Sequence, residues 1–382
     1  MQDSIWFQTI NAEDRRLLGE SDPLPATADA AIIGAGMIGL LTAYYLDAAG
    51  MRSIVVIDKG TAAGEASGAN AGGLWFAQQS PELGPVAPLA AESSRLYQAL
   101  ADDFPFDFER SGLIEILDAE GDVADAQRRA ADAQKVGFRV ERLTGPEARQ
   151  REPELGITPA AAFLYRDDGH LNPAKLAVAL VRHLKQRGVA FCFDTEVHSV
   201  GTRIQTSGGT MEAPKCAITT GAWTPLVTEA LGYTPPIKPI RGTLLAVDPM
   251  PKTIRHTIVA SKYYYWQLAE GHVAGGGTVD DVGFKRGVEA AAVDDIRSEL
   301  DTLFPAVAPR PTVFAWSGFR PYCEDLKPVI GPVPGQSGIF VAAGHFKKGI
   351  MLAPVSGKVM AELMTRGETN LPIGPLSPAR FP

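Results

Sequence analysis

A glycine-rich turn near the start of the chain has the spacing of a nucleotide-binding loop. Residues 34–39 read Gly-Ala-Gly-Met-Ile-Gly, so Gly34, Gly36 and Gly39 form a G-x-G-x-x-G motif. The first glycine of such a motif permits a tight turn, the second lets the backbone approach a pyrophosphate, and the third lets the helix pack on the strand. The amides at the start of that helix face the phosphate charge. The motif predicts dinucleotide binding if a strand precedes it and a helix follows.

The elements that must hold this loop can be read on either side of it. Residues 31–33 form a short apolar strand, residues 37–50 a helix with few charges, and residues 52–58 a second apolar strand. Strand, glycine turn, helix and strand make a βαβ unit, which implies a parallel sheet. Asp58 ends the second strand, 19 residues after Gly39, and is predicted to accept hydrogen bonds from ribose hydroxyls.

A second run of small residues follows Asp58. Residues 64–73 contain four glycines and three alanines, together with a serine and an asparagine, and such a run cannot form a hydrophobic core. It exposes backbone amides to a bulky polar ligand. The run therefore indicates a pyrophosphate and a flat ring lying against the main chain, and a flexible linker is the alternative interpretation.

Composition excludes several classes of protein. The chain has 382 residues, 45% hydrophobic and 21% charged, and a net charge of −8 without a basic block, which is unlike a general nucleic-acid-binding protein. The three cysteines are far apart and the six histidines form no paired motif, so we expect neither structural zinc nor a disulfide scaffold. We also expect no secretory signal and no membrane span.

The order of elements predicts an α/β fold (α+β overall) with a discontinuous first domain. Helix 172–187, strands at 243–248, 256–260, 263–268 and 272–275, and a C-terminal strand followed by helix 353–365 all have the expected periodicity. Consecutive strands without long helices between them indicate an antiparallel sheet. The predicted division is a polar arm at 1–27, a Rossmann-like dinucleotide-binding domain at 28–100, 160–235 and 317–382, and an inserted antiparallel-sheet domain at 101–159 and 236–316.

From about residue 28 onward the chain resembles the flavin-dependent family of D-amino acid oxidase, glycine oxidase and sarcosine oxidase. The motifs that carry the resemblance include IIGAGMIGL, GEASGANAGG, DGHLNP, TTGAW and KPIRG. Two C-terminal motifs, SGFRPYCEDLKPVIGP at 317–332 and AAGHFKKGIMLAP at 342–354, are specific to the glycine oxidase branch. The resemblance implies FAD as the cofactor, so that the Rossmann-like domain is expected to be the FAD-binding domain and the inserted domain the substrate domain.

The resemblance also implies which residues contact FAD. At the pyrophosphate we expect Met37, Ile38, Ala66 and Ser67, and at the ribose Asp58 and Lys59. Along the isoalloxazine ring we expect Ala71, Gly72 and Gly73, at the adenine Val197, and in the TTGAW motif Gly221. Around the pyrimidine edge of the flavin we expect His345, Phe346, Lys347, Lys348, Gly349, Ile350 and Met351. The sequence supports the last group independently of the resemblance. Gly349 precedes a predicted helix, and the dipole of that helix favours negative charge at the pyrimidine edge of the flavin.

Two residues are expected to bind a substrate carboxylate. Arg320 matches the family's carboxylate-binding arginine, and a guanidinium suits a carboxylate bidentately. Tyr264 lies in the aromatic run 263–266 and matches the family's carboxylate-binding tyrosine. Alternate residues of a strand face opposite sides, so a shift of one residue would bring Tyr263 and Tyr265 to the active site instead.

Other residues near these motifs carry further expectations. Lys347 takes the place of an arginine in the relatives and is expected to add positive charge beside the flavin, whereas a solvated loop is the alternative for Lys347 and Lys348. Cys323 does not fall at the position where some sarcosine oxidases attach FAD, so non-covalent FAD is expected. His170 is a possible base or simply a loop histidine.

The chemistry implied by the resemblance is oxidation of a C–N bond in an amino acid or a secondary or N-substituted amine. A hydride passes to flavin N5, and the imine hydrolyses to a keto acid and an amine or ammonia. The electron acceptor is O2 or another acceptor. Alternatives are a flavoprotein subunit of a heteromeric dehydrogenase that passes electrons to a partner or quinone, and a hydroxy-acid-oxidising relative. We expect a cytoplasmic protein with no metal, and the alternatives for its assembly are a homo-oligomer and a complex with such a partner subunit.

Overall fold

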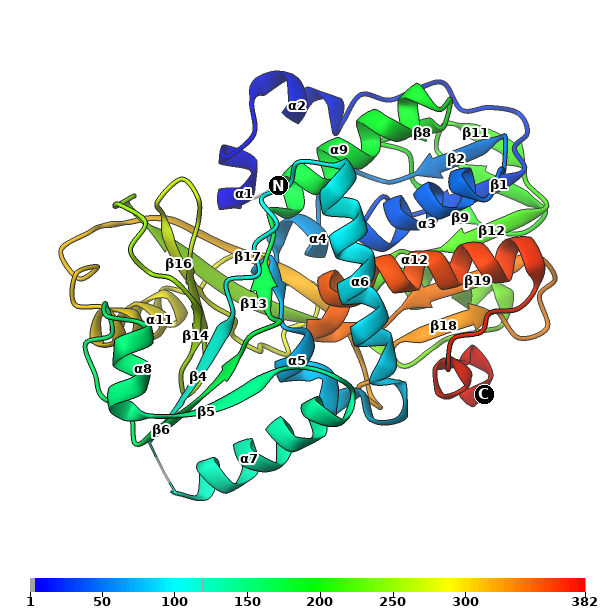
Figure 1. The fold of residues 1–382 in the computed structure, drawn as a ribbon. Coiled ribbons are helices and arrows are strands. Elements are labelled where there is room, and N and C mark those ends of the chain that lie inside the picture. The colour runs from blue at the N-terminus through cyan, green and yellow to red at the C-terminus, as the bar shows by residue number, and fades with distance from the viewer. Residues whose placement is uncertain (1–3, 119, 382) are drawn as a thin grey trace.

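The computed structural model describes residues 4–118 and 120–381 and contains two large sheets (Figure 1). The first has six strands in the order β18-β19-β12-β1-β2-β8, and all neighbours are parallel except β18 and β19. These strands are β1 (Ala30–Ile33), β2 (Ile54–Ile57), β8 (Ala190–Cys192), β12 (Lys215–Ile218), β18 (Val329–Pro332) and β19 (Ile339–Ala343). Every residue of β1 and β2 is buried, as expected for a parallel sheet covered on both faces.

Helices cover one face of this sheet and a small sheet covers the other. Ala30 and Ile32 of β1 share a core with helices α3 (Met37–Ala48), α9 (Pro173–Gln186) and α12 (Gly349–Arg366). Ala31 and Ile33 point the other way, into a core with β9 (Val197–Ser199), β10 (Arg203–Thr206) and β11 (Gly209–Glu212). The predicted βαβ unit is confirmed. The C-terminal helix begins at Gly349, earlier than the start at 353 that its apolar residues indicated.

The second sheet has eight strands in the order β17-β13-β16-β15-β14-β4-β6-β5 and is antiparallel except between β14 and β4. Its strands are β4 (Leu113–Leu117), β5 (Val140–Thr144), β6 (Ala161–Tyr165), β13 (Ile237–Val247), β14 (Thr257–Val259), β15 (Tyr264–Gln267), β16 (Val273–Gly276) and β17 (Thr312–Cys323). Helix α11 (Ala290–Leu303) packs on one face through Ile296 and Leu300. The predicted antiparallel sheet is therefore confirmed.

The remaining elements connect and flank these sheets. They are α4 (Ala66–Ala69), β3 (Gly73–Leu74), α5 (Phe76–Gln79), α6 (Pro88–Asp103), α7 (Glu120–Lys135), α8 (Gly145–Arg151), β7 (Gly169–His170) and α10 (Thr224–Thr228). Helix α6 lies beside α12 in the centre of the molecule (Figure 1).

Two long paired strands join the two halves of the molecule. Ile237 of β13 and Cys323 of β17 belong to the core under the first sheet, whereas Leu245 of β13 belongs to the core of the second. The same hydrogen-bonded pair therefore runs from one half into the other (Figure 1). The division into domains inferred from the sequence stays a prediction.

The N-terminal arm is not a purely polar extension, which corrects the sequence interpretation. It contains α1 (Ile5–Gln8) and α2 (Ala12–Leu17), and Ile5, Trp6 and Phe7 are buried. The indole N–H of Trp6 donates to the carbonyl of Asn70 at 2.7 Å, and the Ser4 hydroxyl donates to the carbonyl of Gly68. The arm is thus attached to the glycine- and alanine-rich run at residues 64–73.

Candidate active site

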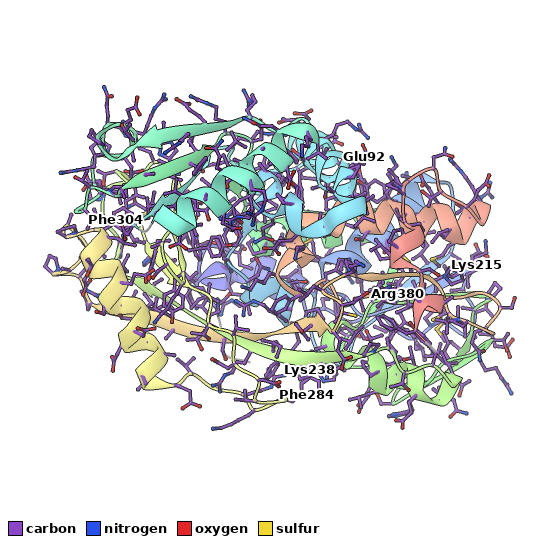
Figure 2. All side chains as sticks on the ribbon, turned by 90° about the horizontal axis from the view of Figure 1, so that it is seen from below. Glu92, Lys215, Lys238, Phe284, Phe304 and Arg380 are labelled. Atoms are coloured by element: carbon purple, nitrogen blue, oxygen red, sulfur yellow. The ribbon has the colours of Figure 1, made fainter. Side chains whose placement is uncertain are left out.

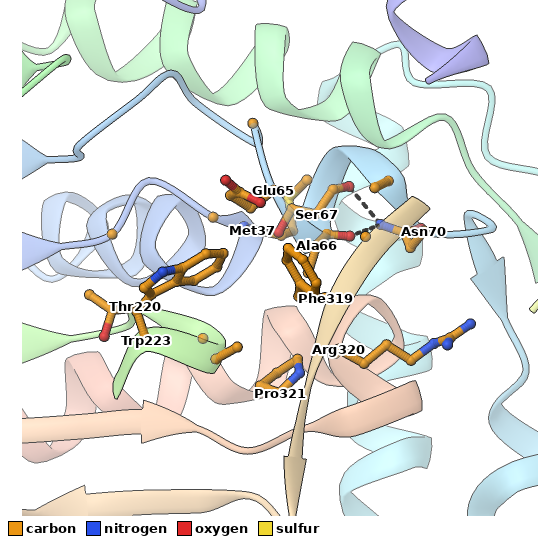
Figure 3. A pocket seen from close by; sticks show the side chains of 18 of the residues that line it. Met37, Glu65, Ala66, Ser67, Asn70, Thr220, Trp223, Phe319, Arg320 and Pro321 are labelled. Atoms are coloured by element: carbon orange, nitrogen blue, oxygen red, sulfur yellow. Dashed lines mark hydrogen bonds between the residues drawn. The ribbon is translucent and has the colours of Figure 1, made fainter. Parts of the chain in front are cut away.

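A cavity of about 710 Å³ lies between the two sheets, lined by residues from both (Figure 3). Its size is typical of small-molecule and cofactor sites, which range over roughly 300–1,000 Å³. We call one part the glycine-loop end, after Gly34 and Gly36, and the other the Arg320 end, where Trp75, Tyr264 and Arg320 lie.

The glycine loop is shaped by its lack of side chains. Gly34 has φ +107°, and a Cβ there would lie 2.7 Å from the carbonyl oxygen of Thr219. A Cβ on Gly39 would lie 1.9 Å from the carbonyl oxygen of Gly34, so only glycine lets α3 approach the turn this closely. Gly36 is the N-cap of α3 and lines the cavity. This cradle fits a pyrophosphate at the N-terminus of a helix.

Asp58 braces the loop from the end of β2. One carboxylate oxygen accepts the amide of Ala35 at 2.7 Å and the other accepts the amide of Gly60 at 2.8 Å. Burial raises the pKa of Asp58, while these hydrogen bonds oppose the rise. Asp58 also lines the cavity, and its contact with a ribose stays a prediction.

Two residues of the TTGAW motif shape the cavity wall next to the loop. Gly221 lines the cavity with φ +54°, and Trp223 lies under Lys59, whose Nζ is 3.8 Å from the indole centroid. Burial lowers the pKa of Lys59. Val197, at the start of β9, lines the same region.

A loop from the second half of the molecule crosses the cavity at this place. Residues 280–289, between β16 and α11, carry Phe284, which stacks on Trp223 with ring centroids 4.8 Å apart. In Figure 2, Phe284 lies at the lower edge of the molecule, near Lys238. Arg286 of the same loop forms an ion pair with Glu65 and lies over Phe319, 5.4 Å from the ring centroid. Glu65, Trp223, Arg286 and Phe319 all line the cavity.

Replacing Phe284 with alanine should speed release of the cofactor. Losing the ring pairs with Trp223 and Phe319, each worth roughly 0.5–1.5 kcal/mol, removes about 1–3 kcal/mol and should raise the dissociation rate of the FAD implied by the family resemblance roughly 5- to 160-fold. The rise of FAD fluorescence on release from the protein measures this rate. Leu326→Ala is the matched control, because Leu326 is also exposed but does not line the cavity. Equal rates in both variants would contradict a retaining role for the loop.

The small-residue run forms a further wall of the cavity. Ala66, Ser67, Ala71 and Gly73 line it, and the Ser67 hydroxyl accepts the amide of Met37 at 2.8 Å. Figure 3 shows Ser67 and Ala66 beside Met37 at the start of α3. The run therefore touches both the glycine loop and the Arg320 end, as expected for a segment that follows an extended cofactor.

The loop before α12 forms another part of the cavity wall. His345, Phe346, Lys347, Gly349 and Ile350 line it. Burial lowers the pKa of His345 to about 3, so this ring is neutral, and its Nε2 lies 2.9 Å from the Ser356 hydroxyl.

The two lysines of this loop have different surroundings. Lys347 lines the cavity, and burial followed by repulsion from Arg320 lowers its pKa. Lys348 is buried and its Nζ lies 2.7 Å from a carboxylate oxygen of Glu82. Lys348 is therefore not a solvated loop residue, and its side chain is directed away from the cavity that Lys347 lines.

Arg320 lies on β17 with part of its surface facing the cavity. Its guanidinium donates to the carbonyl of Thr278 at 2.6 Å and occupies the space that a Cβ on Gly242 would fill. Burial lowers the pKa of Arg320 to about 10, which leaves it charged at neutral pH. No ion pair between Arg320 and a carboxylate occurs within residues 4–118 and 120–381, so this enclosed charge has room for an anionic ligand.

The pairing of β15 settles which tyrosine of the aromatic run faces the cavity. Tyr264 lines it, whereas the Tyr263 hydroxyl donates to Asp295 at 2.7 Å and Tyr265 packs in the core beside α11. The ring of Tyr264 stacks on Trp75, with centroids 3.7 Å apart and an interplanar angle of 6°. Its hydroxyl lies 3.4 Å from the side-chain oxygen of Gln78.

The structure gathers most, but not all, of the sequence-predicted residues at the cavity. Those that do not line it are Gly39, Gly72, Lys348 and Met351. Gly39 and Gly72 act through close packing, since a Cβ on Gly72 would lie 2.3 Å from the carbonyl oxygen of Leu171. Met351 is buried in the first turn of α12.

Sequence reasoning did not single out Trp75, Trp223, Arg286 and Phe319. Trp223 and Phe319 lay inside motifs already identified, TTGAW and SGFRPYCEDLKPVIGP, so their aromatic character was the available signal. Trp75 follows the small-residue run by two positions. Arg286 had no signal, because it reaches the cavity only through the path of the 280–289 loop.

Other candidate groups lie elsewhere or are absent from the described ranges. His170 is buried in β7, 3.7 Å from Glu109 and outside the cavity, and burial lowers its pKa to about 4. Over residues 4–118 and 120–381 no three His, Cys, Asp or Glu side chains come together as a metal site. No helix in that part of the chain is long and apolar enough to cross a membrane.

Comparisons with known proteins agree with this architecture. Residues 29–363 match the family model described as FAD dependent oxidoreductase. The chain is 31% identical to glycine oxidase of Geobacillus kaustophilus, covering 92% of this chain and 97% of that protein. It is 27% identical to hydrogen cyanide synthase subunit HcnC of Pseudomonas aeruginosa, over 93% of this chain and 96% of that protein.

Solved structures give the same result. The crystal structure of glycine oxidase from Geobacillus kaustophilus superposes with a TM-score of 0.89 at 30% identity, covering 94% of this chain and all of that one. L-proline dehydrogenase from P. horikoshii has a TM-score of 0.87 at 23% identity, covering 94% of this chain and 98% of that one, which shows a shared fold. The family resemblance and the fold class inferred from the sequence are confirmed. The chain belongs to the FAD-dependent oxidoreductases of the D-amino acid oxidase family and is a flavoenzyme similar to glycine oxidases.

Proposed function

We propose that the enzyme oxidises the C–N bond of an amino acid or a secondary or N-substituted amine, using non-covalently bound FAD. The observation that carries this proposal is Arg320, an enclosed cation without a carboxylate partner among the described residues, at one end of a cavity whose other end is the glycine loop. A substrate carboxylate would neutralise that charge and fix the orientation of the substrate.

The residues present fit FAD along the whole cavity. Gly34, Gly36, Met37, Ile38, Ala66 and Ser67 would hold its pyrophosphate, Asp58, Lys59, Val197 and Gly221 its adenosine part, and Ala71, Gly73, His345, Phe346, Gly349 and Ile350 its ring system. The Cβ-free cradle at Gly34 is the specific feature that admits a pyrophosphate there. When bound, FAD supplies the two-electron acceptor that removes a hydride from the substrate carbon.

The chain's own residues orient the substrate and set its charge. Arg320 would hold the carboxylate, with Tyr264 and Trp75 as an aromatic wall beside it. The positive charges of Arg320 and Lys347 favour the neutral form of the substrate amine, which is the form that can give up a hydride. The carbon loses the hydride and the nitrogen a proton, and water then adds to the imine to give a keto acid and an amine or ammonia.

The test is a panel of amines, amino acids and hydroxy acids mixed anaerobically with the purified holoenzyme. Loss of the visible flavin absorbance with amines but not with matched hydroxy acids supports the proposal, and the reverse pattern would replace it with hydroxy-acid oxidation. Oxygen uptake with the best substrate identifies an oxidase. Reduction without oxygen uptake would favour a dehydrogenase that passes electrons to a partner, the arrangement suggested by the subunit name of HcnC.

Acid precipitation should release all of the yellow colour into the supernatant. None of the three cysteines lines the cavity, all three are buried, and burial raises the pKa of each thiol. A thiol must ionise to attack a flavin, so covalent attachment is disfavoured. The absorbance of pellet and supernatant measures the partition, and colour that stays in the pellet would contradict non-covalent binding.

The buried, unpaired Cys192, Cys216 and Cys323 also support a location in a reducing compartment such as the cytoplasm. The location of the protein in cells carrying a fluorescent fusion tests this part of the proposal.

A further inference from the structure

We propose that the natural substrate carries two acidic groups, one bound by Arg320 and the other by Lys347. This inference rests on the proposed function and narrows its substrate class to amines with two carboxylates or a comparable pair of anionic groups. It follows from the distribution of charge along the cavity.

Acidic and basic side chains occupy the cavity unevenly. The acids that line it are Asp58, Glu65 and Glu196. Asp58 binds the loop amides, Glu65 pairs with Arg286 from the 280–289 loop, and Glu196 precedes Val197 at the start of β9. All three therefore belong to the glycine-loop end.

The Arg320 end contains two cations instead. Arg320 and Lys347 both line the cavity, and a β-bridge between Tyr322 and His345 holds their two segments side by side. The charge of Arg320 accordingly contributes to lowering the pKa of Lys347. They come from different elements, β17 and the turn before α12, so the fold brings them together from distant parts of the sequence.

Neither cation is neutralised by the part of the chain that the structure describes. Arg320 donates to the Thr278 carbonyl, while the nearby Asp280 is engaged with Arg241 at 3.4 Å. The acid next to the lysine loop, Glu82, pairs with Lys348 and not with Lys347. Two like charges at the same end of a cavity repel each other, and a ligand with two anions relieves that repulsion. At Arg320 the ligand also compensates for the hydration that burial removes.

The two sites differ in how much room they leave. Arg320 is enclosed between Gly242 and the Thr278 carbonyl, which suits a carboxylate held at a fixed place next to the reacting carbon. Lys347 keeps much of its surface exposed, and its ammonium group is carried by a flexible side chain. We therefore assign the second, more distant anionic group of the substrate to Lys347.

The test uses ligands that cannot be oxidised at a C–N bond. Thiodiacetate carries two carboxylates, and methylthioacetate is matched to it except that a methyl group replaces one carboxymethyl group. Their Kd values are measured from the change in flavin absorbance on titration into the holoenzyme. A charge-assisted contact is worth about 1.5–3 kcal/mol, so thiodiacetate should bind roughly 10- to 150-fold more tightly.

The preference should depend on Lys347. Lys347→Met should remove most of the preference for thiodiacetate while leaving the Kd of methylthioacetate nearly unchanged, and Lys347→Arg should retain it. Lys262→Met is the control for net charge, because Lys262 is exposed and pairs with Asp295 away from the cavity. An effect of Lys347 on the cofactor alone would shift the two ligands equally and would overturn the proposal.

Substrates separate this inference from the proposed function. With sarcosine and iminodiacetate, the wild-type enzyme should show a higher kcat/KM for iminodiacetate, and Lys347→Met should reduce that ratio. A wild-type enzyme that oxidises both equally and binds thiodiacetate no better than methylthioacetate refutes the two-anion proposal but not amine oxidation. If no amine reduces the flavin, the proposed function fails, whereas the binding titration still decides on the second anionic site.

Discussion

Replacing Arg320 with leucine should lower kcat/KM for the best substrate by roughly 30- to 5,000-fold. This range corresponds to the 2–5 kcal/mol lost when one partner of a buried, hydrogen-bonded charge pair is truncated. Arg320 is enclosed and has no carboxylate partner among the described residues, so a substrate carboxylate would be its partner. Steady-state kinetics on protein with a measured FAD content give the result.

The FAD content of Arg320→Leu should stay normal, because Arg320 lies at the far end of the cavity from the glycine loop (Figure 3). Arg320→Lys should recover part of the loss, since lysine restores the charge but not the two-pronged geometry of a guanidinium. An unchanged kcat/KM in Arg320→Leu would exclude Arg320 from the substrate site.

Replacing Gly39 with alanine should give a protein that binds FAD poorly and unfolds at a lower temperature. The new Cβ would lie 1.9 Å from the Gly34 carbonyl oxygen and 2.7 Å from the Thr219 hydroxyl, so α3 must move away from the turn. Overpacking of this kind costs about 1–3 kcal/mol or more, and here the displaced backbone is the expected pyrophosphate cradle.

The ratio of FAD to protein after purification and the Tm measure these two effects. Gly374→Ala is the matched control, because a Cβ there meets nothing within 4 Å and the backbone does not have a positive φ. Full FAD occupancy together with an unchanged Tm in Gly39→Ala would show that the turn tolerates a side chain, against the packing argument.

The sequence predicted most of the residues that line the glycine-loop end of the cavity, because the signals there are local. A βαβ unit of about 30 residues contains its own strands, turn and helix, so the position of Gly34 relative to Asp58 follows from short-range geometry. The Arg320 end depends instead on pairing between strands that are distant in the chain. Tyr264 could not be distinguished from its neighbours until its pairing with Gly276 fixed which face it occupies.

The same reason explains the residues that sequence reasoning missed. Arg286 and Phe284 lie on a loop with no periodicity, and only the path of that loop brings them to Glu65 and Trp223. Lys348 lay in a loop of two lysines, and no sequence pattern shows which one is buried against a carboxylate partner. In irregular segments, the direction of a side chain is set by contacts with residues that are distant in the sequence.

The attachment of the N-terminal arm affects how the protein should be handled in the laboratory. Ser4 and Trp6 donate hydrogen bonds to Gly68 and Asn70, and the ring of Phe7 occupies the space beside Gly68. A sequence fused shortly before Ser4 would therefore lie close in the chain to Trp6, which is hydrogen-bonded to Asn70 in the wall of the cavity. The last described residues lie below α12 and β18, well away from that wall (Figure 1). A C-terminal tag is accordingly the safer choice for preparing holoenzyme, and comparing the FAD content of the two fusions would report on the arm itself.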